Sequence, residues 1–373
     1  MGSSAAHHLA RRGEKVLGLD QFDVAHARGS SHGYSRMIRM CYFEHPDYVP
    51  LLRRAYELWR ALEVESGERM LHVTGGVYLG RESSDTVGGS LRAAVMHGLA
   101  HERLGPREIG TRFPQFRTPG DYVGLFEPMA GWLAPERAIR AAAGLARKHG
   151  AEIRTGERVL EWSAASGGVR VQTQLAEYRA DRLIIAAGAW AGRVVKGLGA
   201  EITPTRQVLG WFKPRVPAMF SAGAMPVWAM DDPDSGDLFY GFPMTESPED
   251  SPTAEPLLKL ARHAKGSVID PDRDDREPRP EDEQDIRPFL SRHMPEADGA
   301  LGALRVCMYE NSPDGHFIID RHPARENVIV AAGFSGHGFK FASVIGEVLA
   351  DLAERGETSH PVGFLGLRRL RPS

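Results

Sequence analysis

The spacing of apolar residues predicts helices that alternate with short strands over much of the chain. Residues 45–67 carry apolar side chains three and four positions apart, the period of a helix with one face turned to a core. Runs rich in β-branched residues indicate strands, several of them next to predicted helices. This mixture is typical of an α/β fold. By these criteria we expect further helices up to residue 13 and over 135–149 and 339–355, and strands over 16–20, 151–160, 181–188, 317–320 and 328–332.

From about residue 203 to 240 the pattern changes to longer stretches in which apolar and polar residues alternate. Residues 206–212, RQVLGWF, are one example, and a shorter run at 258–263 is another. Alternation of this kind is typical of mixed or antiparallel sheets with one covered face. We therefore expect a second structural unit built on such a sheet.

Composition limits the functions that the chain can have. With 373 residues, 42% of them hydrophobic, it can bury a large core, and two interleaved domains are expected. A formal net charge of −3 gives no general attraction to nucleic acid or to an anionic membrane, and no apolar run reaches the length of a membrane span. Cys41 and Cys307 are too few for a disulfide framework, which favours a reducing cytoplasm. The sequence shows no metal-ligand spacing and no Ser-His-Asp arrangement.

A glycine-rich turn, GFSGHG at 333–338, lies between a predicted strand and the last predicted helix. Gly333, Gly336 and Gly338 allow a tight turn and a close approach of the backbone to a ligand. The free N–H groups of the helix beginning at Phe339 suit an electron-rich or anionic group. Taken alone, the stretch fits an ordinary strand-to-helix loop as well.

The longer stretch 306–341 carries a family resemblance. It reads VCMYENSPDGHFIIDRHPARENVIVAAGFSGHGFKF. Both its residue types and the spacing from the cysteine to SGHGFK resemble the signature of the monomeric sarcosine oxidase and N-methyltryptophan oxidase family, flavoproteins of the D-amino-acid-oxidase fold. The resemblance covers nearly the whole chain and implies that FAD is bound covalently, through a thioether from Cys307 to the flavin 8α carbon.

The resemblance also implies two discontinuous domains. A Rossmann-like FAD-binding domain would comprise residues 1–70, 134–200 and 300–373, and a substrate domain with a mixed or antiparallel sheet would comprise 71–133 and 201–299. The strand that precedes the first Rossmann helix is absent, so we expect an N-terminally truncated motif. Met1 and Gly2 would then stand in the last part of the phosphate-binding turn.

Cofactor contacts are implied at several further positions. Asp20, at the end of a predicted strand, would hold the adenosine ribose, Val159 would lie near the adenine, and Gly188 would allow a second close approach. In the loop 28–39, the side chains of Ser30, His32 and Arg36 would face the flavin. The last cofactor contacts implied are those of Gly333, Gly336, His337, Gly338, Phe339 and Lys340.

Catalytic roles follow from the same resemblance. Arg39 points away from Arg36 in an extended chain, and with Lys340 it would hold a substrate carboxylate. Lys259 would lie over the flavin N5 and assist the reaction with oxygen. His263, Tyr240 and Tyr309 would reach the substrate pocket.

The predicted function is oxidation of an N-methyl amino acid by oxygen to an imine and hydrogen peroxide, after which the imine hydrolyses to formaldehyde and a primary amine. Two alternatives stay open. One is a related flavin amine oxidase of the pipecolate, glycine or N-methyltryptophan type, and the other is a truncated, non-catalytic homologue unable to hold FAD. We expect a monomer whose partners are a small amino acid and oxygen, with no metal.

Overall fold

The computed structural model describes residues 1–165, 167–245, 251–253 and 255–370. It is a mixed α/β structure, as predicted. The helices are α1 (Gly2–Arg11), α2 (Val49–Ser66), α3 (Ser90–His97), α4 (Pro106–Arg112), α5 (Pro135–Lys148), α6 (Ala191–Val194), α7 (Pro280–Gln284), α8 (Arg287–His293) and α9 (Ala342–Glu354). The strands are β1 (Leu17–Leu19), β2 (Arg36–Ile38), β3 (Leu71–Val73), β4 (Gly76–Gly80), β5 (Glu102–Leu104), β6 (Val123–Glu127), β7 (Gly131–Leu133), β8 (Glu152–Arg154), β9 (Val159–Ala165), β10 (Gly168–Thr173), β11 (Glu177–Ala180), β12 (Leu183–Ile185), β13 (Thr203–Phe212), β14 (Val227–Asp231), β15 (Leu238–Phe242), β16 (Leu258–His263), β17 (Leu301–Asn311), β18 (Ile318–His322) and β19 (Arg325–Ala332).

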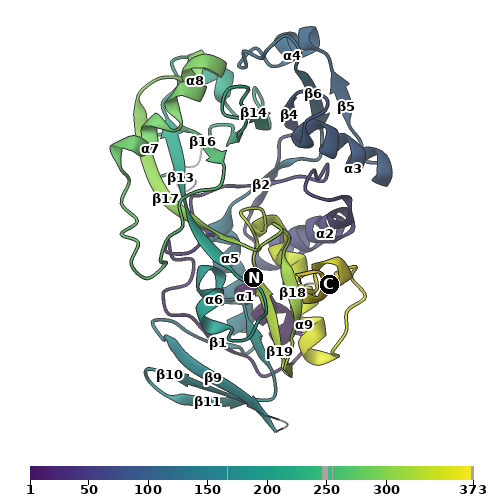
Figure 1. The fold of residues 1–373 in the computed structure, drawn as a ribbon, viewed down its shortest axis with the longest axis vertical. Helices are drawn as coiled ribbons and strands as arrows, with labels where there is room; N and C mark the ends of the chain where they lie inside the picture. The colour runs from purple at the N-terminus through teal and green to yellow at the C-terminus, as the bar shows by residue number, and fades with distance from the viewer. Residues whose placement is uncertain (166, 246–250, 254, 371–373) are drawn as a thin grey trace.

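Small parallel sheets and long helices make up one half of the molecule, the lower half in Figure 1. Strand β1 pairs in parallel with β8, and β12 pairs in parallel with β19, which also pairs with β18. Helix α1 packs against α5 and α9, and an antiparallel sheet of β9, β10 and β11 lies at the bottom of the view. Parallel pairs flanked by helices are the arrangement expected of a Rossmann-like domain.

A large sheet forms the other half. Its strand order is β17-β13-β16-β15-β14-β4-β6-β5, and every neighbouring pair is antiparallel except β14 with β4. The expected mixed sheet is therefore present. Strand β17, which the predicted division assigns to the FAD-binding domain, pairs with β13 of this sheet. The division into domains by residue number stays a prediction.

Helix α2 shows how local sequence signals set an element. It follows a short turn capped by His45, has a proline in its first turn, and ends where Gly67 takes a left-handed conformation with φ of 74°. Its buried face holds Leu51, Leu52 and Leu62, as the apolar spacing predicts. The last helix differs slightly from expectation, because a 3₁₀ turn precedes α9 and the α-helix begins only at Ala342.

The glycine turn before α9 has the tight geometry that its sequence predicts. Gly333 and Gly336 have φ of 66° and 81°, and Ser335 between them has φ of 47°. A Cβ added to Gly336 would lie 2.4 Å from the ring of Tyr309, so only glycine fits there. Among the described residues, no helix is both long and apolar enough to cross a membrane.

Candidate active site

A cavity of about 2200 Å³ runs between the parallel sheets and the large sheet. That volume is well above the roughly 300–1,000 Å³ typical of a site for a drug-sized ligand, and it suits a dinucleotide together with a small substrate. Most of the residues predicted for cofactor and substrate line it: Gly2, Asp20, Ser30, Arg36, Arg39, Val159, Gly188, Tyr240, His263, Cys307, Tyr309, Gly336, His337, Gly338, Phe339 and Lys340.

Cys307 differs from the other cysteine in its surroundings. It lies on β17, where its Sγ faces the cavity 3.6 Å from Nη2 of Arg36. Arg36 is held in place by the carbonyl oxygens of Ser30 and Ser35, each at 2.8 Å. Cys41 is buried away from the cavity, and burial raises the pKa of its thiol. Of the two, only Cys307 is placed to react with a bound molecule.

Polar atoms on the loop 28–39 lack partners. The buried Oγ of Ser30 has no hydrogen-bond partner among the described residues, and neither ring nitrogen of His32 has one. Burial lowers the pKa of His32 to about 3, so its ring is neutral. Buried polar atoms are nearly always satisfied in proteins, and because Ser30 lines the cavity, its hydroxyl is available to a polar ligand there. His32 is not among the described residues that line the cavity.

Lys259 is held against the loop 28–39. Its ammonium group donates to the carbonyl oxygens of Gly33 and Ser35 at 2.7 and 2.8 Å and to the Ser35 hydroxyl at 3.0 Å. Burial holds its pKa well below the usual range. Lys259 and Gly333 are not among the described residues that line the cavity, and the predicted contacts of both with the flavin stay predictions.

Two basic side chains, Arg39 and Lys340, line the cavity. Arg39 is buried, and its Nη2 lies 2.7 Å from both carboxylate oxygens of Glu44. Lys340 is also buried and donates to the carbonyl oxygen of His337 at 2.8 Å. Burial lowers the pKa of Lys340 to about 7.

Burial opposes ionisation of Glu44, yet the adjacent Arg39 charge brings the pKa of Glu44 down to about 2. The Glu44 carboxylate is therefore ionised and forms an ion pair with the Arg39 guanidinium.

His337 is neutral and fixed in one tautomer. Its Nε2 lies 2.9 Å from the carbonyl oxygen of Gly315, which can only accept, so Nε2 carries the hydrogen. Its Nδ1 lies 2.6 Å from the hydroxyl of Tyr42, which donates to it. Burial lowers the pKa of His337 to about 3, consistent with this arrangement. Both ring nitrogens of His337 therefore have partners, and its carbonyl oxygen accepts a hydrogen bond from Lys340.

An uncharged wall faces these cations. His263 Nδ1 lies 3.0 Å from the hydroxyl of Tyr309, and Tyr240 packs nearby. Burial lowers the pKa of His263 and raises those of both tyrosines. The three side chains come from β16, β17 and β15 of the large sheet, so the sheet register sets their mutual positions.

The part of the cavity lined by Gly2, Asp20 and Gly188 leaves space where the phosphates of a nucleotide would approach. A Cβ added to Gly2 or to Gly188 would meet nothing closer than 3.9 Å, although both residues line the cavity. Asp20 directly follows β1, and its Oδ1 accepts the backbone N–H of Phe22 at 2.9 Å. Together with the unsatisfied Ser30, these residues fit FAD.

The sequence did not predict three side chains that contact or line the candidate site: Tyr42, Glu44 and Glu310. The first two follow Arg39 within a few residues, and an acid so close to a predicted anion-binding arginine was a usable signal. Glu310 lines the cavity, has a buried Oε2 with no partner among the described residues, and has its pKa raised to about 8 by burial. Its neighbour Tyr309 was predicted, but the fold alone shows that Glu310 is enclosed.

Comparison with known proteins decides the family. Residues 1–352 match the FAD dependent oxidoreductase family, DAO. The chain belongs to this family. It is 44% identical over 372 residues to a monomeric sarcosine oxidase of Streptomyces avermitilis, covering 99% of this chain and 95% of the relative. A monomeric sarcosine oxidase of Bacillus sp. is 39% identical, with 99% and 94% covered. An N-methyl-L-tryptophan oxidase of Salmonella dublin is 37% identical, with 96% and 93% covered.

Solved structures of the same fold include more distant proteins. NikD, an unusual amino acid oxidase of nikkomycin biosynthesis, superposes with a TM-score of 0.84 at 24% identity, covering 98% of this chain and 94% of that one. Glycine oxidase from Geobacillus kaustophilus gives 0.78 at 19% identity, with 98% and 95% covered. The predicted family, fold class and dependence on FAD are thereby confirmed.

Proposed function

We propose that this FAD-dependent oxidoreductase oxidises a secondary, N-methylated amino acid with oxygen as the acceptor. The observation that carries the proposal is the pair Arg39 and Lys340, two buried cations in the same cavity as Cys307. The products would be hydrogen peroxide and an imine that hydrolyses to formaldehyde and a primary amine. The sarcosine and N-methyl-L-tryptophan oxidases among the relatives support this reading.

Bound FAD would supply the hydride acceptor and pass the electrons to oxygen. Asp20, Gly2 and Gly188 would hold its adenosine and phosphate end, and Ser30 and Arg36 would contact it near the ring. We infer that Cys307 attaches it covalently. The Arg36 guanidinium, 3.6 Å from Sγ, would stabilise the sulfur as a thiolate after it loses its proton. The new S–C bond would replace a C–H bond of the 8α carbon, which gives up a proton, and the electron pair released would be carried by the flavin to oxygen.

Arg39 and Lys340 would hold the substrate carboxylate and so aim the reacting C–H bond. Positioning of this kind removes several kcal/mol from a barrier, on the order of a hundredfold or more in rate. Because Glu44 already binds Arg39, an incoming carboxylate has to compete with it or share the guanidinium. Lys340, with a pKa of about 7, can take up a proton when the anion arrives.

The neutral wall of His263, Tyr240 and Tyr309 would face the substrate amine. Because none of these groups carries a charge at neutral pH, the wall gives no ion pair to an ammonium group. It therefore favours the uncharged amine, the form from which a hydride can leave. The hydroxyl of Tyr309 and the ring of His263 would orient its nitrogen.

A bulkier substrate is a second candidate. A smaller cavity of about 660 Å³ shares Phe43, His263 and Tyr309 with the main one. Sarcosine has no side chain, and a substrate that has one would have room to extend it past these residues. This favours an N-methylated aromatic or cyclic amino acid as the runner-up, in line with the N-methyl-L-tryptophan relatives.

A hydrogen peroxide assay over a panel of amino acids tests the proposal. The panel contains sarcosine, N-methyl-L-tryptophan, pipecolate and glycine, with formaldehyde measured in parallel. We expect peroxide and formaldehyde in equal amounts from an N-methylated member. Peroxide without formaldehyde, from glycine or pipecolate only, would assign the chain to the related class, and no flavin reduction by any member would overturn the proposal.

We also propose that the active species is a single chain, which gel filtration tests.

A further inference from the structure

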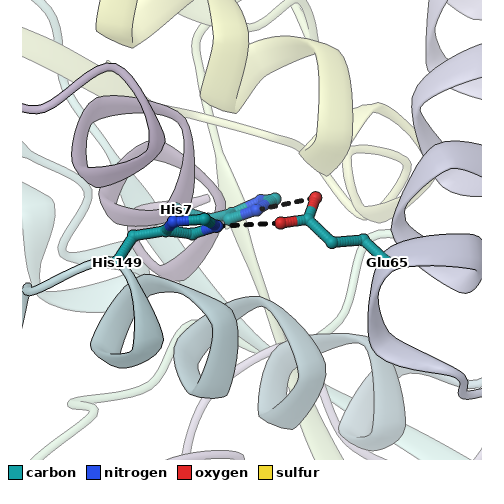
Figure 2. A group of neighbouring side chains, drawn as sticks. All are labelled: His7, Glu65 and His149. Carbon is teal, nitrogen blue, oxygen red and sulfur yellow. Dashed lines mark hydrogen bonds and ion pairs between the residues drawn. The ribbon is translucent and has the colours of Figure 1, made fainter.

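A cluster of metal-binding side chains lies away from the cavity. His7 comes from α1, Glu65 from the last turn of α2, and His149 from the residue that follows α5. Figure 2 shows both imidazole rings directed at the Glu65 carboxylate from the same side. None of the three lines the cofactor cavity, so the cluster has no part in the proposed reaction.

The distances suit a small metal ion. Nε2 of His149 lies 2.9 Å from one oxygen of Glu65, and Nε2 of His7 lies 3.4 Å from the other. All three ligand atoms are within 4.8 Å of one another. Zinc bonds to nitrogen and oxygen are about 2.0–2.2 Å long, so tetrahedral ligands sit roughly 3.4 Å apart. Small side-chain rotations would bring the three atoms to that separation.

The environment of His7 is the second observation that points to a ligand. Its side chain is only 7% exposed, and its Nε2 has no hydrogen-bond partner among the described residues although it faces Glu65. A buried nitrogen that points at a carboxylate without a proper hydrogen bond is unsatisfied. A cation between the two groups would satisfy the imidazole lone pair and the carboxylate together.

We propose that His7, Glu65 and His149 bind one divalent ion of the zinc class. Two imidazoles and one carboxylate are a zinc ligand set, and they suit Mg²⁺ or Ca²⁺ less well. The Glu65 and His149 side chains are 24% and 32% exposed, which leaves water access to a fourth position. Arg11 now lies 3.6 Å from Glu65, but it is 56% exposed and can swing into solvent when the ion binds.

The ion would connect three helices that are distant in sequence. Helix α1 begins at the cavity, where Met1 and Gly2 form part of the wall, and it packs against α5 and α9. A bond from His7 to α2 and to the end of α5 would fix α1 against both. The expected effect is on stability rather than on the chemistry of the site.

The test uses the purified flavoprotein, stripped with EDTA and dialysed against ZnCl₂. Metal per chain is counted by mass spectrometry, and the melting temperature is measured with and without zinc. We expect one more zinc per chain in the wild type than in His149→Gln or Glu65→Gln. At a hundredfold excess over Kd, zinc should raise the wild-type melting temperature by about 3 °C, and neither variant should show this rise.

His360→Gln is the matched control. It breaks a contact of 2.8 Å with Glu347 that resembles the His149–Glu65 contact, but among the described residues His360 and Glu347 belong to no group of three side chains with ligand atoms close enough to hold a metal ion. It should bind zinc and gain stability as the wild type does. The proposal would be overturned if the wild type and His149→Gln bound equal amounts of zinc, or if His360→Gln lost as much zinc as His149→Gln. Glu65 would then be an ordinary ion-pair partner.

Discussion

Nη2 of Arg39 lies 2.7 Å from both carboxylate oxygens of Glu44, so the proposed anion-binding cation already has an anion. Both groups are largely enclosed, with side chains 5% and 14% exposed. A buried pair of this kind is costly to break by removing one charge. If Arg39 binds the substrate carboxylate as proposed, the pair also sets the affinity of the site, because that carboxylate and Glu44 compete for one guanidinium.

Glu44→Gln should tighten the binding of a carboxylate that cannot be oxidised, such as acetate. The amide still accepts a hydrogen bond from Arg39 but no longer neutralises it, so we expect roughly a tenfold lower Kd. Acetate binding is followed through the change in the flavin absorption spectrum. Asp47→Asn, which removes a nearby exposed charge, is the control and should leave the Kd unchanged. Weaker binding in Glu44→Gln would show that the carboxylate serves only to position Arg39.

Acetate binding should also depend on pH through Lys340. Its pKa of about 7 means that the ammonium is charged below pH 7 and mostly neutral above it. Above pH 7 the site has to take up a proton when the anion binds, so the apparent Kd should rise, approaching tenfold per pH unit. Titrations from pH 6 to 9 measure this slope. Lys340→Met should flatten it, and a flat wild-type profile would contradict the assignment.

The two buried lysines should act on different half-reactions. Lys340→Met removes half of the carboxylate clamp and should weaken substrate binding by about 1.5–3 kcal/mol, roughly a tenfold to hundredfold loss. Lys259→Met should leave reduction of the flavin by substrate largely intact and slow its reoxidation. Stopped-flow measurement separates the two steps. If both variants slowed reoxidation equally while substrate affinity stayed normal in Lys340→Met, the roles would be wrongly assigned.

Lys259 has a second possible effect, because its ammonium holds the loop through Gly33 and Ser35. Loss of that contact would release Arg36, which the carbonyl of Ser35 positions. Lys259→Arg keeps the charge but changes its geometry, and it separates the two effects. Recovery of the reoxidation rate in Lys259→Arg would indicate that the charge matters, and continued slowing would indicate that the loop position matters.

Cys307→Ala should release the flavin on acid precipitation, whereas the wild type should keep its yellow colour in the pellet. Cys41→Ala is the control, since Cys41 is buried away from the cavity and should not affect attachment. Absorbance of the supernatant at the flavin maximum measures the released fraction. Release of all the flavin from the wild type would refute covalent attachment.

Features of the candidate site that depend on residues close together in the chain could be predicted from sequence motifs. The turn of Gly333 and Gly336 and the strand predicted before it, over 328–332, are adjacent in the chain, and the fold has both. Contacts between distant segments could not be predicted. His7, Glu65 and His149 form no ligand spacing in the sequence and meet only because three helices pack together. The position of Lys259 likewise depends on a loop more than 200 residues earlier in the chain.

Strand β17 carries Cys307 and Tyr309 two positions apart, so their side chains leave the same face of the sheet. Two residues of extended chain measure about 6.6–6.8 Å. If the flavin is attached at Cys307, strand β17 fixes the distance between the attachment point and Tyr309 in the pocket wall. Its pairing with β13 keeps the strand from bending. Enlarging the pocket for a longer substrate therefore has to come from Tyr240 on β15 or His263 on β16, because these side chains lie on other strands than the one that carries the anchor.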